Sequence, residues 1–402
     1  MNKGELRTLL VDPDPGTPAG RIVRLLSERG GLSGTQIAGL TGLAKSTVST
    51  TLAELRKSGL VVDHEAELAD APRGASVGRP RTVVTLNPQA GTCVGVVIGL
   101  RKIQVVVADV SHAIISDSSA AIAPDFSPQQ AIEVVKGLMD LAYEEHSLSR
   151  NGLLGVGLAI AGPVNPIDSR IQRASVVPTW AGIDIRAAFA PALERPIYAD
   201  NESNCAALAE MMWGAAVGYD DFVLFKIDEG VGGAIVVGGK VMTGIAGGAG
   251  EFGHMTIDPD GPLCRCGNRG CLELYASFKH HLVLASERFG RDLSMEEVIE
   301  MAEQGDVGCR RLIEDTAQHA GRGLGMIGTI LNPPLVVVAG RMAHAGDMLI
   351  TPLKASYERH TLVKWGDVGP EARTQIVKGR FTSNDSALGA VGMVLRHHGR
   401  LS

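Results

Sequence analysis

The chain contains 402 residues, of which 45% are hydrophobic and 20% are charged, with 50 glycines and a formal net charge of −6. This length and composition indicate a globular protein of roughly two to four domains and exclude an intrinsically disordered chain. The apolar runs are shorter than the ~18–20 residues that cross a bilayer and no signal sequence is evident, so we expect a cytoplasmic protein that does not enter a membrane.

Charge is distributed unevenly along the chain. Residues 1–90 contain 11 Lys/Arg and 9 Asp/Glu, a net charge of +2, which leaves −8 for the remaining 312 residues. A mildly basic N-terminal segment followed by an acidic body is expected if only the N-terminal segment binds a polyanion. The bias is small, so a prediction of nucleic-acid binding depends on the motifs.

Three short helices are predicted after an irregular leader at residues 1–17. The first helix starts just after Pro18 and ends at Gly30, and Ser33 caps the second. A turn at Gly42 leads into the third helix. Its buried face is expected to contain Val48, Leu52 and Leu55.

The outer face of the third helix carries short hydroxyl side chains and one positive charge, which suit a helix that enters a DNA major groove. These residues are Lys45, Ser46, Thr47, Ser49 and Thr50. Strands at 60–62 and 82–86 then predict a hairpin, or wing, where Arg79 and Arg81 can reach phosphates or a minor groove. A three-helix unit can also be a plain packing module. The turn, the outer face and the wing together favour a winged helix-turn-helix DNA-binding domain at residues 18–90.

Beyond residue 90, strands and helices alternate in two similar halves. Strands are predicted at 94–98, 104–110, 154–161 and 197–199, then at 222–227, 232–237 and 335–339. This pattern predicts an α/β body with two lobes and a ligand cleft between them. We assign the first lobe to residues 91–200, rejoined by 383–402, and the second lobe to residues 201–382.

One imidazole and three thiols gather in a short glycine-rich segment. His254, Cys264, Cys266 and Cys271 have the donor types of a closed tetrahedral zinc site. Alternatively, these cysteines are free or form disulfides. The expected cytoplasmic location argues against disulfides. The other three cysteines, Cys93, Cys205 and Cys309, are expected to pack as small apolar residues.

The segment Gly247–Glu273 closely resembles the second signature of the ROK family of repressors, open reading frames and sugar kinases. Gly157–Val164, Asn201–Glu210 and Leu331–Gly340 follow the order and approximate spacing of that family. The resemblance implies an actin-like, two-lobed body, a sugar pocket in the cleft, a structural zinc ion and a homodimer or homotetramer. The added winged head resembles that of the family's transcription factors.

The resemblance also implies the residues of the sugar pocket. Asn201 matches the family's sugar-binding asparagine, Glu251 and His254 match its Glu-x-x-His pair, and Glu273 matches the glutamate after the last zinc cysteine. Carboxylates and amides suit vicinal hydroxyl groups, and His254 could use one ring nitrogen for zinc and the other for sugar. Alternatively, Glu251 and Glu273 only orient the zinc loop.

Three departures set the chain apart from the family's kinases. The first hairpin has Val97 where the kinases have an aspartate, and the second phosphate loop reads Asp228-Glu229-Gly230, whose two carboxylates would repel a triphosphate. Glu202 replaces the catalytic aspartate; it can still bind a hydroxyl, but its longer side chain misplaces the base. We therefore expect a sugar-binding body without catalytic residues that does not bind ATP.

The sequence thus predicts a sugar-responsive repressor of carbohydrate-metabolism genes, with a monosaccharide or sugar phosphate as effector. A dimer would place its two recognition helices on a palindromic operator. Two alternatives remain: an ATP-dependent sugar kinase with an added DNA-binding domain, and a body whose regulator is a protein partner.

Overall fold

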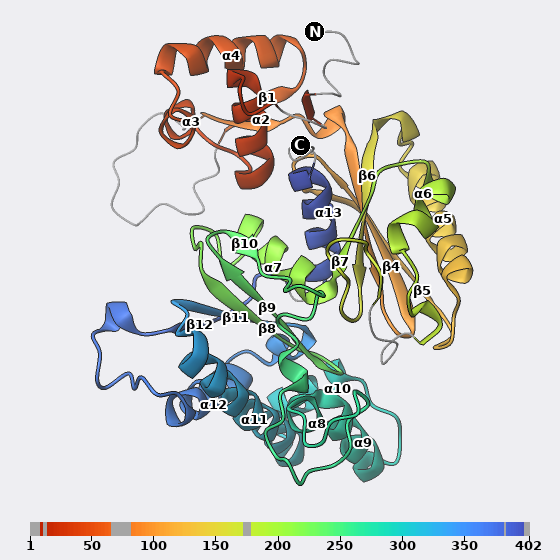
Figure 1. Cartoon of the computed structure of the whole chain (residues 1–402), viewed down its shortest axis with the longest axis vertical. Coiled ribbons are helices and arrows are strands. Elements are labelled where there is room, and N and C mark those ends of the chain that lie inside the picture. Colours follow the sequence, from red (N-terminus) through yellow and green to blue (C-terminus); the bar gives the residue numbers. More distant parts are fainter. Residues whose placement is uncertain (1–8, 11–13, 66–81, 172–177, 382, 398–402) are drawn as a thin grey trace.

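The computed structural model describes residues 9–10, 14–65, 82–171, 178–381 and 383–397. Figure 1 shows a small helical head next to a body that contains two five-stranded sheets. No helix within these described ranges is long and apolar enough to cross a membrane.

The head contains the three predicted helices, α2 (Pro18–Arg29), α3 (Gly34–Thr41) and α4 (Lys45–Lys57). Their ends follow from local chemistry, because Thr17 and Ser33 cap α2 and α3 through their hydroxyl groups. Strands β1 (Val61–Glu65) and β2 (Thr82–Leu86) pair antiparallel, with Val61 opposite Leu86. Ile22, Leu26, Val48, Leu52 and Leu55 are buried between these elements.

The first sheet has the strand order β5-β4-β3-β6-β7, and β3 pairs antiparallel with β4 and parallel with β6. Its strands are β3 (Thr92–Ile98), β4 (Lys102–Asp109), β5 (Ile114–Ala121), β6 (Leu153–Ile160) and β7 (Ile197–Asn201). One face is covered by α5 (Pro128–Glu145) and α6 (Ile185–Leu193), as Figure 1 shows. The sequence did not predict β5. This edge strand contains three serines and an aspartate, so it lacks a clear alternation of apolar and polar residues.

The second sheet has the order β10-β9-β8-β11-β12 and repeats the antiparallel hairpin followed by parallel strands. Its strands are β8 (Phe222–Ile227), β9 (Val231–Val237), β10 (Lys240–Val241), β11 (Leu335–Ala339) and β12 (Gln375–Lys378). Its helices are α8 (Glu273–Ala276), α9 (Phe278–Phe289), α10 (Met295–Glu303), α11 (Val307–Leu331) and α12 (Asp347–His360). Short 3-10 turns are η2 (Pro88–Ala90), η3 (Arg150–Gly152), η4 (Pro178–Trp180), η5 (Phe252–His254), η6 (Arg341–Ala345) and η7 (Pro370–Ala372).

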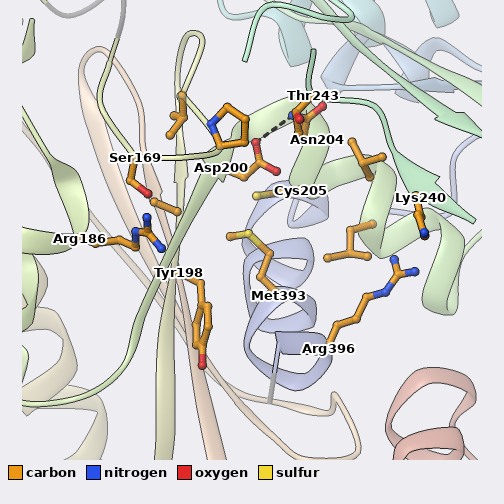
Figure 2. A pocket seen from close by; sticks show the side chains of 15 residues that line it. Ser169, Arg186, Tyr198, Asp200, Asn204, Cys205, Lys240, Thr243, Met393 and Arg396 are labelled. Carbon is orange, nitrogen blue, oxygen red and sulfur yellow. Dashed lines mark hydrogen bonds between the residues drawn. The ribbon is translucent and has the colours of Figure 1, made fainter. Parts of the chain in front are cut away.

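Two helices between the sheets join the body to the head. α7 (Glu202–Trp213) and α13 (Asp385–His397) pack on each other, α13 also covers β3 and β6, and both contact α2. A Cβ atom on Gly157 would lie 2.0 Å from the carbonyl oxygen of Ala390, so this approach requires glycine. These helices and β7 also border a pocket of about 290 Å³ (Figure 2).

The head and the body share one hydrophobic core. Ile22 and Leu26 of α2 belong to the same buried cluster as Leu208 and Met212 of α7 and Leu395 of α13. At the end of α7, the ring of Trp213 stacks on His112, with centroids 4.5 Å apart. The head is therefore packed onto these two helices over a buried surface.

Candidate functional site

The four predicted metal ligands lie together. The donor atoms of His254, Cys264, Cys266 and Cys271 are all within 4.8 Å of one another. The Sγ atoms of Cys266 and Cys271 are 3.6 Å apart, and Sγ of Cys264 is 3.7 Å from Nδ1 of His254. Thiolates held about 2.3 Å from a tetrahedral zinc ion lie about 3.8 Å from each other, so the donor set and its spacing fit this ion.

Tight turns bring these donors together. The backbone N–H of Cys264 donates to the carbonyl oxygen of Asn268, and Gly270 has φ +57°, a conformation that favours glycine. A Cβ atom on Gly270 would also lie 1.5 Å from the carbonyl oxygen of Asp258. The cysteine loop is thus shaped by its backbone. The remaining cysteines, Cys93, Cys205 and Cys309, are buried as expected.

His254 faces the cysteines with one ring nitrogen and a carboxylate with the other. Nδ1 points to Cys264, while Nε2 lies 4.0 Å from Oε2 of Glu251. Burial, together with the charges of Glu273 and Glu202, raises the pKa of Glu251 to about 7.

The predicted sugar-pocket carboxylates converge from three segments. Glu202 is the first residue of α7, Glu251 precedes η5, and Glu273 is the first residue of α8. Oε2 of Glu273 accepts a hydrogen bond of 3.0 Å from Nη2 of Arg265, which lies between two cysteines of the loop. This hydrogen bond connects Glu273 to the cysteine loop and is compatible with both roles that the sequence predicts for it.

Asn201 is engaged by the backbone around it. Its Oδ1 accepts from the N–H of Ser203 at 2.7 Å and caps α7, while its Nδ2 donates to the carbonyl oxygen of Gly162 at 2.9 Å. The residue is only 7% exposed. The side chain thus fixes the end of β7 against the loop that follows β6, and so holds Glu202 at the start of α7.

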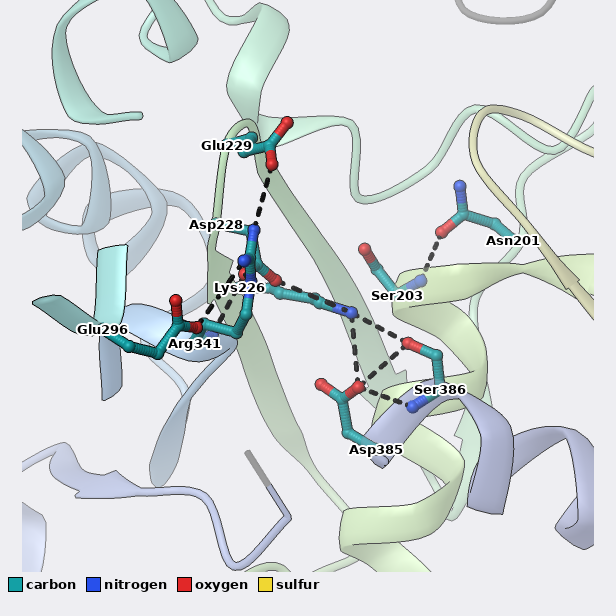
Figure 3. A network of polar contacts seen from close by, with 9 residues as sticks. All are labelled: Asn201, Ser203, Lys226, Asp228, Glu229, Glu296, Arg341, Asp385 and Ser386. Atoms are coloured by element: carbon teal, nitrogen blue, oxygen red, sulfur yellow. Dashed lines mark hydrogen bonds and ion pairs between the residues drawn. The ribbon is translucent and has the colours of Figure 1, made fainter. Parts of the chain in front are cut away.

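An ion-pair network lies where the sequence places the second phosphate loop (Figure 3). Nζ of Lys226 donates to Ser386 at 2.8 Å and to Asp385 at 3.3 Å, and lies 4.0 Å from Asp228. Burial alone would lower the pKa of Lys226, but the carboxylates of Asp385, Glu202 and Asp228 outweigh it and raise this pKa. Lys226 lies on β8 and Asp385 starts α13, so the pair ties the second sheet to the helix that covers the first.

Arg341 completes this network. Its Nε donates to Asp228 at 3.0 Å and its Nη2 to Glu229 at 3.2 Å, while Nη1 lies 3.6 Å from Glu296. Both loop carboxylates thus have an arginine partner, which reduces the repulsion of a triphosphate that the sequence predicts. The paired side chains themselves occupy the end of the loop.

Sequence reasoning missed the partners in this network. Lys226 and Asp385 are 159 residues apart in the chain, and Arg341 lies 113 residues after Asp228. Neither pair forms a local motif. The unusual residue was Lys226 itself, a single charge within the buried strand β8.

The five DNA-contacting residues predicted on the third helix lie at the start of α4. In Figure 1, α4 lies at the end of the head farther from the body. Lys45, Ser46, Ser49 and Thr50 are exposed, whereas Thr47 is half-buried. Arg79 and Arg81 lie outside the described residues.

Comparisons with known proteins agree with this architecture. The model of the ROK family matches residues 93–397, and that of bacterial regulatory proteins of the arsR family matches residues 20–62. The chain is 27% identical to the xylose repressor of Bacillus subtilis over 368 residues, which cover 91% of each chain.

Two solved structures are also similar. A ROK family glucokinase from Streptomyces griseus, in complex with glucose and AMPPNP, is 26% identical with a TM-score of 0.68, over 75% of this chain and 99% of that one. A ROK family transcriptional regulator, a homologue of the E. coli MLC protein, has a TM-score of 0.71 at 21% identity, over 94% of this chain and 96% of that one. The predicted fold, an N-terminal helix-turn-helix region before a sugar-kinase-like body, is confirmed. The family match spans more than half of the sequence, and the chain belongs to the ROK family.

Proposed function

We propose that this protein is a sugar-responsive, DNA-binding repressor of carbohydrate-metabolism genes. The observation that carries the proposal is the core shared by the helix-turn-helix head and α7, because α7 begins at Asn201 and Glu202 of the predicted sugar pocket. The similarity to a xylose repressor over 91% of both chains supports the same function.

The proposed sugar site consists of Asn201, Glu202, Glu251, His254 and Glu273. The charges of Glu273 and Glu202 both raise the pKa of Glu251, which supports placing the three carboxylates around a common space. Hydrogen bonds from vicinal hydroxyl groups would stabilise these crowded carboxylates in their charged form. A monosaccharide or a sugar phosphate would bring such groups.

His254, Cys264, Cys266 and Cys271 would hold a structural zinc ion. Zinc would supply a closed, non-redox crosslink for the loop. The loop in turn places Arg265 against Glu273, and His254 against Glu251. We therefore infer that loss of the metal would weaken sugar binding even though the ion need not touch the sugar.

Phosphoryl transfer is disfavoured in this proposal. The network of Lys226, Asp228 and Arg341 occupies the end of the phosphate loop, where the kinases of the family would hold the nucleotide. The similarity to a glucokinase keeps the kinase alternative open to a direct assay.

The two helices that contact the head give the sugar a physical route to DNA. α7 leads from Glu202 to Trp213 at the head, and α13 leads from Asp385 to Leu395 in the shared core. A change in the angle between the lobes would displace both helices and hence the head. In a dimer or tetramer this would alter the spacing of two recognition helices on a palindromic operator.

The test begins with DNA fragments selected from a random pool by the purified protein. A mobility-shift assay with these fragments and a panel of monosaccharides and sugar phosphates should identify one ligand that changes DNA affinity. Glu251→Gln should abolish the response to the sugar and preserve DNA binding. Glu133→Gln, at an exposed position of α5, is the matched control and should preserve both. No response to any sugar would contradict ligand control, and sugar-dependent ADP formation would support the kinase alternative.

A further inference from the structure

A second pocket, distinct from the proposed sugar site, lies at the edge of the first sheet. Its walls come from β7, α7, α13, the loop after β6 and the β10 segment, and its volume is about 290 Å³. That is close to the lower end of the range for small-molecule sites, ~300–1,000 Å³. None of the five predicted sugar residues lines it.

The charged side chains of this pocket are mostly positive. Arg186 comes from α6, Lys240 from β10 and Arg396 from α13, and Asp200 is the one acidic residue that lines the pocket. In Figure 2, Arg186 lies at one side, and Lys240 and Arg396 lie at the other. This excess of positively charged lining side chains favours an anionic ligand.

Backbone contacts position the two guanidinium groups. Nη2 of Arg186 donates to the carbonyl oxygen of Ile167 at 3.1 Å, and Nη2 of Arg396 donates to that of Gly239 at 2.7 Å. Both acceptors are neutral carbonyl groups, so these two contacts orient the guanidinium groups without adding a negative charge to the pocket. A guanidinium anchored in this way is suited to a planar oxyanion such as phosphate or carboxylate.

A buried amide on the floor of the pocket lacks a partner. Nδ2 of Asn204 donates to Oδ1 of Asp200 at 2.8 Å, as Figure 2 shows, but its Oδ1 has no hydrogen-bond partner although the residue is only 3% exposed. An orphaned buried carbonyl oxygen of this kind is uncommon in folded proteins. A ligand hydroxyl group that reached it after a small side-chain rotation would satisfy it.

The position of the pocket links it to the head. Asn204, Cys205 and Leu208 line it from α7, and Met393 lines it from α13. These are the two helices that pack against α2. The same wall also includes Lys240 from the second sheet, so an occupant would contact both lobes.

We propose that this pocket binds a small hydroxylated metabolite with two separated anionic groups, such as a phosphorylated carboxylic acid. One anionic group would contact Arg186, the other Lys240 and Arg396, and the hydroxyl group Asn204. The ligand contacts both lobes and the helices that carry the head, so this pocket is a second effector site.

The test uses 3-phosphoglycerate, which has no sugar ring, in calorimetric titrations of the full chain. We expect it to bind more tightly than inorganic phosphate or glycerate, each of which lacks one of its two ends. The double variant Arg186→Gln/Arg396→Gln should weaken binding at least about tenfold, since it removes charge-assisted hydrogen bonds to both anionic groups. Lys240→Gln, at an exposed position, gives the same test if the double variant does not fold.

Two matched variants complete the experiment. Lys136→Gln removes one positive charge at an exposed position of α5 and should not change the affinity for 3-phosphoglycerate. Glu251→Gln, in the proposed sugar site, should also leave this affinity unchanged. Hydrogen exchange in α7 and α13 should slow when 3-phosphoglycerate is bound. The proposal is overturned if 3-phosphoglycerate does not bind at about 5 mM, or if its affinity is the same in the Arg and Lys240 variants. Neither result bears on the sugar response, which is tested separately with DNA.

Discussion

At the scale of single residues, the buried pair of Lys226 and Asp385 has the largest expected effect. The side chain of Lys226 is 10% exposed and that of Asp385 is 5% exposed. Lys226→Met would leave Asp385 buried without its cation, and we expect a loss of about 3–5 kcal/mol in the free energy of unfolding. Urea denaturation measures this loss.

A matched pair on the surface provides the control for that prediction. Arg291 and Glu297 also form an ion pair, but their side chains are 55% and 41% exposed. Arg291→Met should change the stability by less than about 1 kcal/mol. Adding Asp385→Leu to Lys226→Met should restore part of the lost stability, and an additive further loss would refute a direct pairing.

The metal ligands give a second prediction at this scale. Cys271→Ser should abolish stoichiometric zinc binding and weaken sugar binding, because the loop that orients Glu273 and His254 would lose its crosslink. Cys309→Ser replaces a cysteine outside the cluster and should keep one zinc ion per chain. Zinc content by mass spectrometry and sugar affinity by calorimetry are the two measurements. Unchanged sugar affinity in the zinc-free Cys271 variant would contradict the link between metal and pocket.

At the scale of elements, the contact between α13 and the first sheet depends on glycine. A Cβ atom on Gly157 would clash with the backbone of α13, so Gly157→Ala should reduce the stability by about 1–3 kcal/mol or more. Gly137→Ala is the control, since Gly137 lies on an exposed part of α5 with no atom near its Cβ direction. That substitution should stabilise the helix by up to about 1 kcal/mol. Thermal unfolding of both variants measures these changes. An unchanged stability of the Gly157→Ala variant would contradict the packing argument.

The turn between β4 and β5 gives a pH-dependent prediction for the junction of head and body. His112 stacks on Trp213, and burial lowers its pKa to about 4, against opposing attraction from Asp109 and with a smaller lowering by Arg380. The unfolded chain therefore takes up a proton on this residue near its ordinary pKa of about 6.5, whereas the folded chain does not. This contribution to stability is complete above that pH and is lost as the pH falls towards 4.

The measurement compares the wild type with His112→Asn, which keeps a residue that tolerates the φ of +67°. Between pH 7 and pH 5 the wild type should lose about 2 kcal/mol more stability than the variant. If both lose the same amount in urea denaturation, His112 does not titrate as expected.

The elements also show what the sequence could and could not predict. Caps and turns are local, so Ser33, Gly42 and the close cysteine spacing predicted the head and the cysteine cluster correctly. The start of α11 at Val307 is also set locally, by the side chain of Asp306 that caps it. Pairings between distant segments, such as Lys226 with Asp385, leave no local pattern. The second pocket could not be predicted for the same reason.

At the scale of the whole molecule, α7 and α13 connect the proposed sugar site and the second sheet to the helix-turn-helix head. The shared core makes the head part of the body's packing, so a ligand that shifts these helices acts on the head directly. The ion pair of Lys226 and Asp385 adds a link from the second sheet to α13. Lobe movement is therefore expected to reach the head as a displacement of helices.

Thermodynamic linkage gives the most direct test of this claim. The sugar found in the mobility-shift panel is titrated by calorimetry into the free protein and into its complex with the selected DNA. We predict that DNA changes the sugar affinity by the same factor, and in the same direction, as the sugar changes the DNA affinity. Equal sugar affinity with and without bound DNA would contradict the account.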